Sequence, residues 1–419
     1  MSPSLLVLTG AHVNRITSSF TPAYLQSLMA DVFALVSSQS ESNPNNPTSN
    51  PTSYMPQRIV FPTENHKVLF MPSRICDMGT TMKIVSVPTN PGDLRGLPAS
   101  TIVLDQDTGG VKAIVNARTL TALRNAAGSL LSTNLIGPTH PTHIVAFGAG
   151  QQILAHLDLH LKAYPESIRS ITIINRSMNQ RFRDMVSTLR SRHPTSSVVQ
   201  ENLQCLEWTP LSSSTAPSQT ETPNSRNVRQ ALSSASIIIT ATPSRIPLFP
   251  SLWVPDNAHV ILIGSYTKEM KEVDRELILR AVSSESSESP RLLVDSVDAC
   301  LGEAGELLDA LDAGLSRNQM MEIGEVILER RRKGLGFDDY CLRQGFEGET
   351  RTSSSDASSH DFQNFNGPIT LFKSVGVGLQ DVAIACAVVD RAEEMRMREA
   401  EDDEVGGEVG VLVDGYDGV

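Results

Sequence analysis

A glycine-rich turn follows a short apolar run in the middle of the chain. Residues 143–147 read His-Ile-Val-Ala-Phe, which predicts a buried strand, and they lead directly into Gly148-Ala149-Gly150. Glycines let the backbone approach a ligand closely, and a helix that starts there presents free N–H groups and a partial positive charge. The chemistry that this turn could serve is the binding of a pyrophosphate. Such triplets also occur in ordinary turns, so the motif alone leaves both interpretations open.

Two further positions bear on this predicted cofactor site. The third position of the G-x-G-x-x-G/A pattern is Ile153, a departure that loosens the usual tight packing of helix on strand. The next apolar run, over 170–174, is followed by Asn175-Arg176-Ser177, with no acid to hold a ribose 2′-hydroxyl. Arg176 could pair with a 2′-phosphate, which favours NADP(H) and leaves NAD(H) possible. The alternative interpretation is a solvated loop arginine.

The pattern around the turn predicts the elements that must position it. Apolar runs over 170–174, 236–240 and 259–263 predict three more buried strands, and a helix is expected from about Gln152 to Ala163. Strands that alternate with helices favour a Rossmann-type, doubly wound parallel sheet, so the fold class is α/β.

The N-terminal part of the chain has a different pattern. Short β-branched runs over 58–61, 67–70, 82–87 and 101–104 are separated by Pro, Gly and Asn, which predicts a mostly antiparallel sheet. Apolar residues over 117–135 recur at helical spacing. We therefore expect an α+β domain ahead of the parallel sheet.

Composition limits the partners. The chain has 419 residues, of which 40% are apolar, enough for two or three domains. Its net charge of -12 and its scattered basic residues argue against nucleic acid as a partner. No stretch approaches the roughly 20 apolar residues of a membrane span, and no secretory signal is visible at the N-terminus. We expect a protein of the cytoplasm that does not bind membranes.

Neither the cysteines nor the histidines suggest a metal site. The five cysteines are odd in number, lie far apart and form no CxxC pair, which favours reduced thiols. His156 and His160 are four residues apart on one predicted helix, but no acid or third ligand accompanies them. No metal is expected.

Four segments look too polar to belong to the folded core. They are 43–53, 212–227, 347–366 and the acidic tail 399–419. Each lacks the apolar surface that would offset the entropy of ordering the chain, so we interpret the first three as insertions and expect 347–366 and 399–419 to be disordered.

Several motifs occur together in an order that is typical of one family. They are Thr121–Ala127 (TALRNAA), Gly148-Ala149-Gly150 with Gln152, Asn175-Arg176-Ser177, Glu322–Glu325 (EIGE), and Ile369–Gly376 (ITLFKSVG) running into Gly378–Ala383 (GLQDVA). On these residues the chain closely resembles the ornithine cyclodeaminase/mu-crystallin family over about Met55–Ala392. The family includes cyclodeaminases, ketimine reductases, and alanine and related amino-acid dehydrogenases.

The resemblance implies an organisation and a set of cofactor contacts. Residues 1–130 with the returning segment 368–398 would form a substrate-binding and dimerisation domain, and 131–330 the dinucleotide-binding domain of a homodimer. The cofactor contacts that it implies are Gly148, Ala149, Gly150, Gln152, Asn175, Arg176, Ser177 and Thr240.

The resemblance also implies a substrate site. Arg58 and Arg124 resemble the family's carboxylate-binding arginines, and Lys83 resembles its active-site lysine, which can hold the substrate carboxylate as well. A guanidinium fixes a planar carboxylate and so orients the neighbouring carbon, while a desolvated lysine can exchange a proton with substrate nitrogen. Without the resemblance, surface arginines and a lysine that covers apolar neighbours would be the simpler interpretation.

One departure separates the activities of the family. Many members, the cyclodeaminases among them, carry an Asp where this chain has Tyr266, and a phenol is neutral at pH 7. We therefore expect an NAD(P)-dependent oxidoreductase that acts on the C–N bond of a small amino or imino acid, by imine (ketimine) reduction or amino-acid dehydrogenation. Cyclodeamination of ornithine to proline and ammonia is the first alternative, with Glu269 or Glu272 as substitute acids. A catalytically weak NADP(H)-binding protein is the second.

Overall fold

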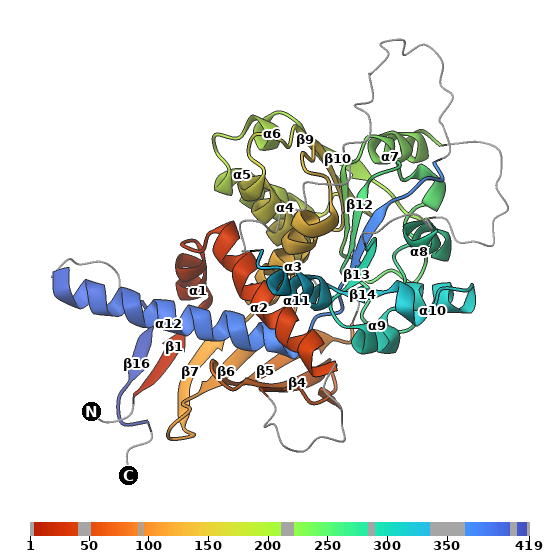
Figure 1. The fold of residues 1–419 in the computed structure, drawn as a ribbon. Helices are drawn as coiled ribbons and strands as arrows, with labels where there is room; N and C mark the ends of the chain where they lie inside the picture. Colours follow the sequence, from red (N-terminus) through yellow and green to blue (C-terminus); the bar gives the residue numbers. More distant parts are fainter. Residues whose placement is uncertain are drawn as a thin grey trace. The chain divides into compact units, whose positions relative to one another are not determined.

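The computed structural model describes residues 4–40, 52–90, 93, 96–210, 222–283, 290–335, 365–402 and 409–416. The chain divides into two units (Figure 1). Unit 1 is Met1–Gly128 with Gly376–Val419, and unit 2 is Ser129–Val375. Helix α3 (Leu120–Ile136) begins in unit 1 and ends in unit 2.

Unit 1 is built on a sheet in the order β16-β1-β7-β6-β5-β4-β2, with β3 also paired to β4. The strands are β1 (Leu5–Leu8), β2 (Ser53–Tyr54), β3 (Ile59–Pro62), β4 (His66–Ile75), β5 (Gly79–Pro88), β6 (Ala99–Leu104), β7 (Val111–Asn116) and β16 (Val411–Val413). The helices are α1 (Gly10–Thr17), α2 (Pro22–Ser40) and α12 (Gly378–Asp402). All pairs are antiparallel except β1 with β7.

The long helix α12 covers one face of this sheet and packs mainly on β4, β5 and α2 (Figure 1). Residues alternate between the two faces of a strand, and on β5 the side that faces α12 includes Thr81 and Lys83, whereas Met82 and Ile84 lie on the other face and are only half-buried. The predicted antiparallel sheet is thus confirmed. The elements β1, α1 and α2 were not predicted.

Unit 2 is built on a fully parallel sheet in the order β10-β9-β8-β11-β12-β15-β13-β14. The strands are β8 (His143–Phe147), β9 (Ser170–Asn175), β10 (Leu203–Glu207), β11 (Ile237–Thr240), β12 (His259–Leu262), β13 (Leu292–Val294), β14 (Met321–Glu322) and β15 (Thr370–Lys373). The helices are α4 (Gln151–Ala163), α5 (Gln180–Arg192), α6 (Ser197–Gln200), α7 (Pro223–Ser233), α8 (Arg275–Val282), α9 (Val297–Glu303), α10 (Gly305–Asp312) and α11 (Ile323–Arg332), with 3-10 turns at Ser251–Trp253 and Arg317–Gln319.

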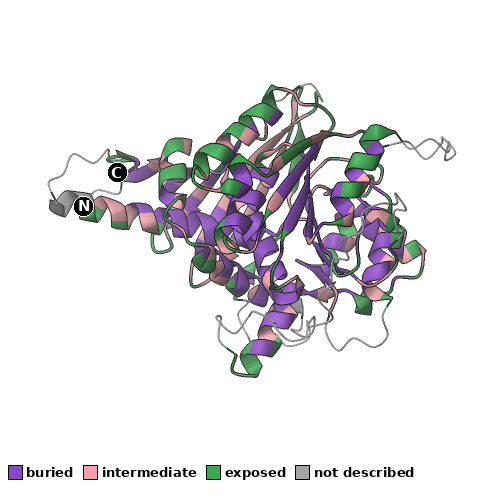
Figure 2. Ribbon diagram, turned by 90° about the horizontal axis from the view of Figure 1, so that it is seen from above, coloured by how far each residue is buried: buried purple, intermediate pink, exposed green. Residues whose placement is uncertain are grey.

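The predicted doubly wound α/β class is confirmed. Every residue of the strands β8, β11, β12 and β15 is buried, and Figure 2 shows strands of this sheet in the colour of buried residues. Such continuous burial is expected for parallel strands with helices on both faces. No helix of the described residues is long and apolar enough to cross a membrane.

Three sequence predictions need correction. Residues 368–375 were assigned to the substrate domain, but Thr370–Lys373 form β15 between β12 and β13, because this apolar run pairs in register with His259–Leu262. The tail was expected to be disordered, but Val411–Val413 form an edge strand beside β1. Part of the segment 212–227 is helical, since Thr222 caps α7 and Pro223 starts it.

The rest of those segments lies outside the described residues. This applies to 43–51, 212–221, 347–364, 403–408 and 417–419.

Candidate functional site

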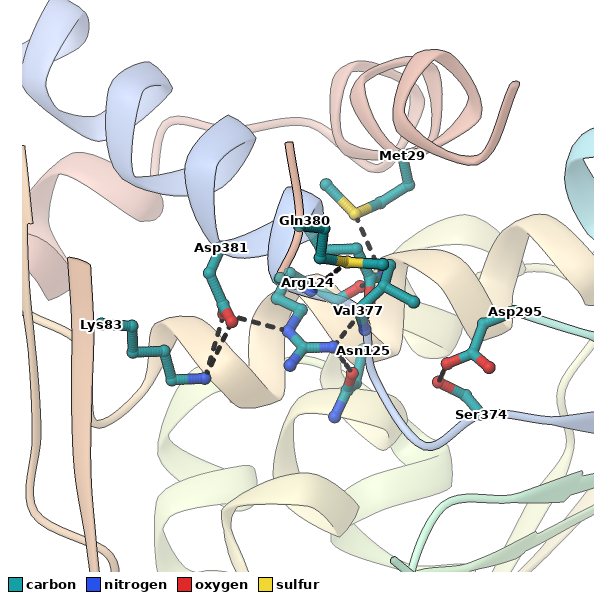
Figure 3. A network of polar contacts seen from close by, with 11 residues as sticks. Met29, Lys83, Arg124, Asn125, Asp295, Ser374, Val377, Gln380 and Asp381 are labelled. Atoms are coloured by element: carbon teal, nitrogen blue, oxygen red, sulfur yellow. Dashed lines mark hydrogen bonds and ion pairs between the residues drawn. The ribbon is translucent and has the colours of Figure 1, made fainter. Parts of the chain in front are cut away.

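Three charged side chains from distant parts of the sequence meet inside unit 1 (Figure 3). Asp381 Oδ1 lies 3.0 Å from Lys83 Nζ and 3.3 Å from Arg124 Nε, and Asp381 Oδ2 lies 3.1 Å from Lys83 Nζ. The side chains are 5% or less exposed. We call Lys83, Arg124 and Asp381 the charged triad.

The elements of unit 1 explain why these side chains converge. Lys83 points from β5 toward α12, and Asp381 lies in the first turn of α12, where an acid interacts favourably with the helix dipole. Arg124 comes from the first turns of α3. Gly376 has φ +85°, and a Cβ there would lie 2.6 Å from Nη1 of Arg124, so only glycine leaves room for the guanidinium.

The guanidinium of Arg124 is held on two sides. Nη1 donates to Asn125 Oδ1 at 2.5 Å and to Gln380 Oε1 at 2.6 Å, while Nε donates to Asp381. Among the described residues, no side chain or carbonyl accepts a hydrogen bond from Nη2. The arginine is therefore fixed in orientation and keeps one nitrogen with donor capacity for a carboxylate.

The charges of the triad do not cancel, because two cations face one carboxylate. Burial lowers the pKa of Lys83, and so do the neighbouring charges of Arg124 and Arg58, whereas Asp381 opposes that shift. Such a site attracts one further negative charge and contains a lysine that can give up its proton.

Arg58 precedes β3 and is half-buried. Its charge contributes to the lowered pKa of Lys83, so it lies within electrostatic range of the triad. Of the predicted substrate residues, the structure joins Lys83 and Arg124 through Asp381 and places Arg58 near them.

In unit 2 the glycine turn lies where the strand order reverses. β9 and β10 lie on one side of β8, and β11 and β12 on the other, so the turn after β8 is at the switch point where doubly wound sheets bind ligands. Gly148 has φ +124°, and a Cβ there would lie 3.0 Å from the carbonyl oxygen of Ala241. Gly150 is the N-cap of α4 and no side chain caps the helix.

The residues around the turn fit a pyrophosphate. Free N–H groups at the start of α4 can bind an anion, and the backbone of Ala149 runs between the two glycines. The amide oxygen of Gln152 is buried and accepts no hydrogen bond within the described chain. Ile153, the departure from the motif, is fully buried, and its Cγ1 would lie 3.3 Å from a Cβ on Gly148.

Two arginines lie near the turn. Arg176 is exposed after β9 and flanked by Asn175, whose Nδ2 donates to the carbonyl of Ser177 at 2.7 Å. Arg181, in the first turn of α5, was not predicted. Its Nη2 would lie 2.9 Å from a Cβ on Gly150, so its guanidinium lies against the turn.

Glu272 ties together the ends of two strands. Its buried carboxylate accepts hydrogen bonds from Thr240 Oγ1 at 2.8 Å, from Thr242 N and Oγ1 at 2.6 and 2.9 Å, and from Gly264 N at 2.6 Å. The hydroxyl of Thr240, a predicted cofactor contact, is thus directed into the protein. Both carboxylate oxygens of Glu272 are engaged in these bonds.

Tyr266 follows a residue that is held firmly. The fully buried Lys373 donates to Ser265 O at 2.8 Å and to Ser265 Oγ at 2.6 Å, and it pairs with Glu306 at 3.2 Å. Tyr266 itself is half-buried, and Glu269 is exposed.

The paired histidines are structural. Nε2 of His156 and His160 lies 2.9 and 3.1 Å from the hydroxyls of Ser129 and Thr133 on α3, and Nε2 of His259 lies 3.1 Å from that of Ser132. Burial lowers the pKa of His156 to about 3, of His160 to about 4 and of His259 to about 3, so all three are neutral. Among the described residues, no group of three or more His, Cys, Asp or Glu could hold a metal.

Known proteins similar to this chain point to one family. The model of the ornithine cyclodeaminase/mu-crystallin family matches residues 27–201. The chain is 26% identical over 345 residues to a Delta(1)-pyrroline-2-carboxylate reductase of Colwellia psychrerythraea, which covers 80% of this chain and 89% of the relative. It is 26% identical to the ketimine reductase mu-crystallin of Mus musculus, over 65% of this chain and 74% of the relative.

Over residues 27–201 the chain is similar to the ornithine cyclodeaminase/mu-crystallin family. A solved structure supports the fold. Delta(1)-pyrroline-2-carboxylate reductase of Thermococcus litoralis, in complex with NADH and L-proline, superposes with a TM-score of 0.67 at 19% identity and covers 93% of this chain and 98% of that one. The resemblance seen in the sequence is confirmed.

The partners of the predicted site residues were not predicted from the sequence. Asn125, Gln380 and Asp381 stood inside the quoted motifs, yet they were given no role. Asp381 is separated from Lys83 by 298 residues, so no local spacing could pair them. One signal was present, because an Asp in the apolar helix pattern after Gly378 needs a buried partner.

Proposed function

We propose that this chain is an NAD(P)H-dependent reductase of the C=N bond in a small imino acid, or in the reverse direction an amino-acid dehydrogenase. The observation that carries the proposal is the charged triad, a buried group with one excess positive charge and one guanidinium nitrogen that donates to no described residue. A substrate carboxylate supplies the missing negative charge.

Each side chain has a distinct task in this proposal. Arg124 binds one carboxylate oxygen through Nη2, and Arg58 adds a second cation near the same place. Lys83 Nζ gives a proton to the substrate nitrogen while a hydride adds to the adjacent carbon, so that C=N becomes CH–NH. The lysine is then neutral and regains its proton from solvent.

The cofactor site is assigned to unit 2. The bound nicotinamide dinucleotide supplies the hydride. Its pyrophosphate would lie on Gly148-Ala149-Gly150 and the start of α4 with Gln152, and its ribose beside Asn175, Arg176 and Ser177. Arg176 and Arg181 together favour NADP(H), since two guanidinium groups suit a 2′-phosphate, and NAD(H) is the alternative cofactor.

The proposal includes a homodimer. The face of the unit 1 sheet that α12 leaves uncovered presents half-buried Phe70, Met82, Ile84 and Ile102, and β3 exposes Ile59, Val60 and Phe61. An apolar surface of this kind is typical of a protein interface. Cys205, Cys300 and Cys386 are free thiols, which suits the reducing cytoplasm, and we place the enzyme there.

The test is NADPH and NADH oxidation, followed at 340 nm with pyrroline-2-carboxylate and piperideine-2-carboxylate. We expect turnover with a cyclic imine, and a fall in kcat/KM of at least about 100-fold in Arg124→Ala and Lys83→Met. The matched control is Lys333→Met, which changes an exposed lysine at the C-terminal end of α11. We expect this variant to keep wild-type rates.

Two other outcomes would overturn the proposal. Formation of proline and ammonia from ornithine with NAD, without imine reduction, would identify a cyclodeaminase despite Tyr266. Release of bound nicotinamide on denaturation, without turnover of any imine or amino acid, would identify a binding protein.

A further inference from the structure

We infer that Asp381 is a positioning residue that fixes Lys83 and Arg124 in one arrangement and keeps Lys83 charged until the substrate nitrogen takes its proton. This inference rests on the proposed function.

The geometry singles out Asp381 because one carboxylate serves two cations from different elements. Both of its oxygens contact Lys83 Nζ, at 3.0 and 3.1 Å, and Oδ1 also accepts from Arg124 Nε at 3.3 Å. Asp381 is 4% exposed, so water does not compete for these bonds. Its position therefore couples the placement of the two cations.

The start of α12 sets the rotation of the guanidinium. Gln380 accepts a hydrogen bond from Nη1 of Arg124, and the next residue, Asp381, accepts one from Nε (Figure 3). Among the described residues, none accepts a hydrogen bond from the remaining nitrogen, Nη2. The backbone N–H of Val377 donates to the same amide oxygen of Gln380 at 3.2 Å, so the turn before the helix is fixed to this pair as well. Loss of Asp381 would remove the contact at Nε and leave the guanidinium held only at Nη1, so its orientation would be less fixed.

The electrostatic effect follows from the charges that face Lys83. They are Arg124 from α3, Arg58 before β3 and Asp381 from α12, and of these only Asp381 favours the charged lysine. Without it, a buried ammonium would face two guanidinium groups, and Lys83 would lose its proton at a lower pH.

The sign of the pH effect is the same in both directions of the reaction. Imine reduction needs charged Lys83 and is lost as pH rises through the pKa of Lys83. Amino-acid oxidation needs neutral Lys83 as the base, so its rate increases as pH rises through the same pKa. Asp381→Asn lowers that pKa, so both limbs move to lower pH. A side chain that only supported the fold would lower the rate without moving either limb.

The experiment is the pH dependence of kcat/KM for reduction of pyrroline-2-carboxylate, with the full-length wild type and three variants. In Asp381→Asn we expect the alkaline limb to move down by at least about one pH unit, and KM for the imino acid to rise about 10-fold as Arg124 is released. Asp381→Glu retains the charge and should keep its limb within about half a unit of the wild type. Asp390→Asn, on the same helix, should behave as wild type.

An unmoved limb in Asp381→Asn, with a uniformly lower rate, would overturn the inference. If Asp381→Asn does not fold, the test rests on Asp381→Glu. A shift of its alkaline limb by more than one pH unit would overturn the inference.

A second measurement separates this inference from the proposed function. Trace acetic anhydride labels neutral amines, and peptide mass spectrometry then gives the pH at which Lys83 becomes reactive. A lower titration pH in Asp381→Asn than in wild type supports the inference even if no imine is turned over, which would reject only the proposed function. Equal titration in both proteins would overturn the inference.

Discussion

The carboxylate of Asp381 lies 3.0 Å from the ammonium of Lys83, although 298 residues separate them in the chain. The pair connects the N-terminal strands of unit 1 to the helix that returns at the C-terminal end. It also explains how an almost fully buried lysine can carry a charge, because its partner offsets part of the cost of burial.

Replacement of the lysine tests proton transfer. Lys83→Met keeps the length of the side chain but removes its proton, so kcat/KM for imine reduction should fall by about 100-fold to 10,000-fold. Steady-state kinetics measure this, and circular dichroism checks that the variant folds. If kcat/KM of Lys83→Met equals that of the Lys333→Met control, the role of Lys83 is contradicted.

A substitution at Gly376 tests the space that Arg124 needs. Gly376→Ala introduces a Cβ that would lie 2.6 Å from the guanidinium, at a backbone φ of +85° that disfavours side chains. We expect KM for the imino acid to rise at least about 10-fold, since the carboxylate contact is disturbed. Affinity for the cofactor, from fluorescence titration of NADPH, should stay unchanged. A matched change at exposed Gly302, where a Cβ meets nothing within 4 Å, serves as the control.

We expect the two arginines at the glycine turn to influence the choice of cofactor. Arg176→Ala and Arg181→Ala should each raise KM for NADPH by about 10-fold, because a charged hydrogen bond to a 2′-phosphate contributes about 1.5–3 kcal/mol. KM for NADH should change much less in Arg176→Ala. Equal effects on both cofactors in that variant would show that Arg176 does not contact the 2′-phosphate.

The buried histidines predict a loss of stability in acid. His156, His160 and His259 have folded pKa values of about 3, 4 and 3, below the unfolded value near 6.5, so only the unfolded chain binds protons between these limits. The contribution of these three histidines to the free energy of unfolding is fully present above pH 6.5 and is lost as pH falls below it. Between pH 7 and pH 5.5 the three together remove about 4 kcal/mol from the free energy of unfolding.

Urea unfolding at both pH values measures this loss. His160→Gln retains a side chain that can bond Thr133 but does not titrate, so its pH-dependent loss should be smaller by about one third. An identical pH dependence in this variant and the wild type would contradict the assignment.

The sequence predicted the elements whose periodicity is strong. The strands at 143–147 and 170–174 and the helix that follows Gly150 lie within one or two residues of their predicted bounds, because a parallel sheet demands continuous apolar runs. The edge strand β16 was missed, since three apolar residues in an acidic tail make a weak local signal.

The site was harder to predict than the fold. Arg124 and Lys83 were found through motifs, but their carboxylate partner depends on how α12 packs on β5, which no local pattern encodes. Thr240 was predicted as a cofactor contact, and that stays a prediction. Its hydroxyl donates to Glu272, a contact that depends on the loop after β12.

The most direct test of the account follows the hydride itself. The enzyme would reduce pyrroline-2-carboxylate with nicotinamide cofactor deuterated at C4, and mass spectrometry and NMR would locate the label in the product. We predict one deuterium on the α-carbon of proline, with label transfer lost in Arg124→Ala. Proline without deuterium, or no proline with either NADPH or NADH, would contradict imine reduction by this chain.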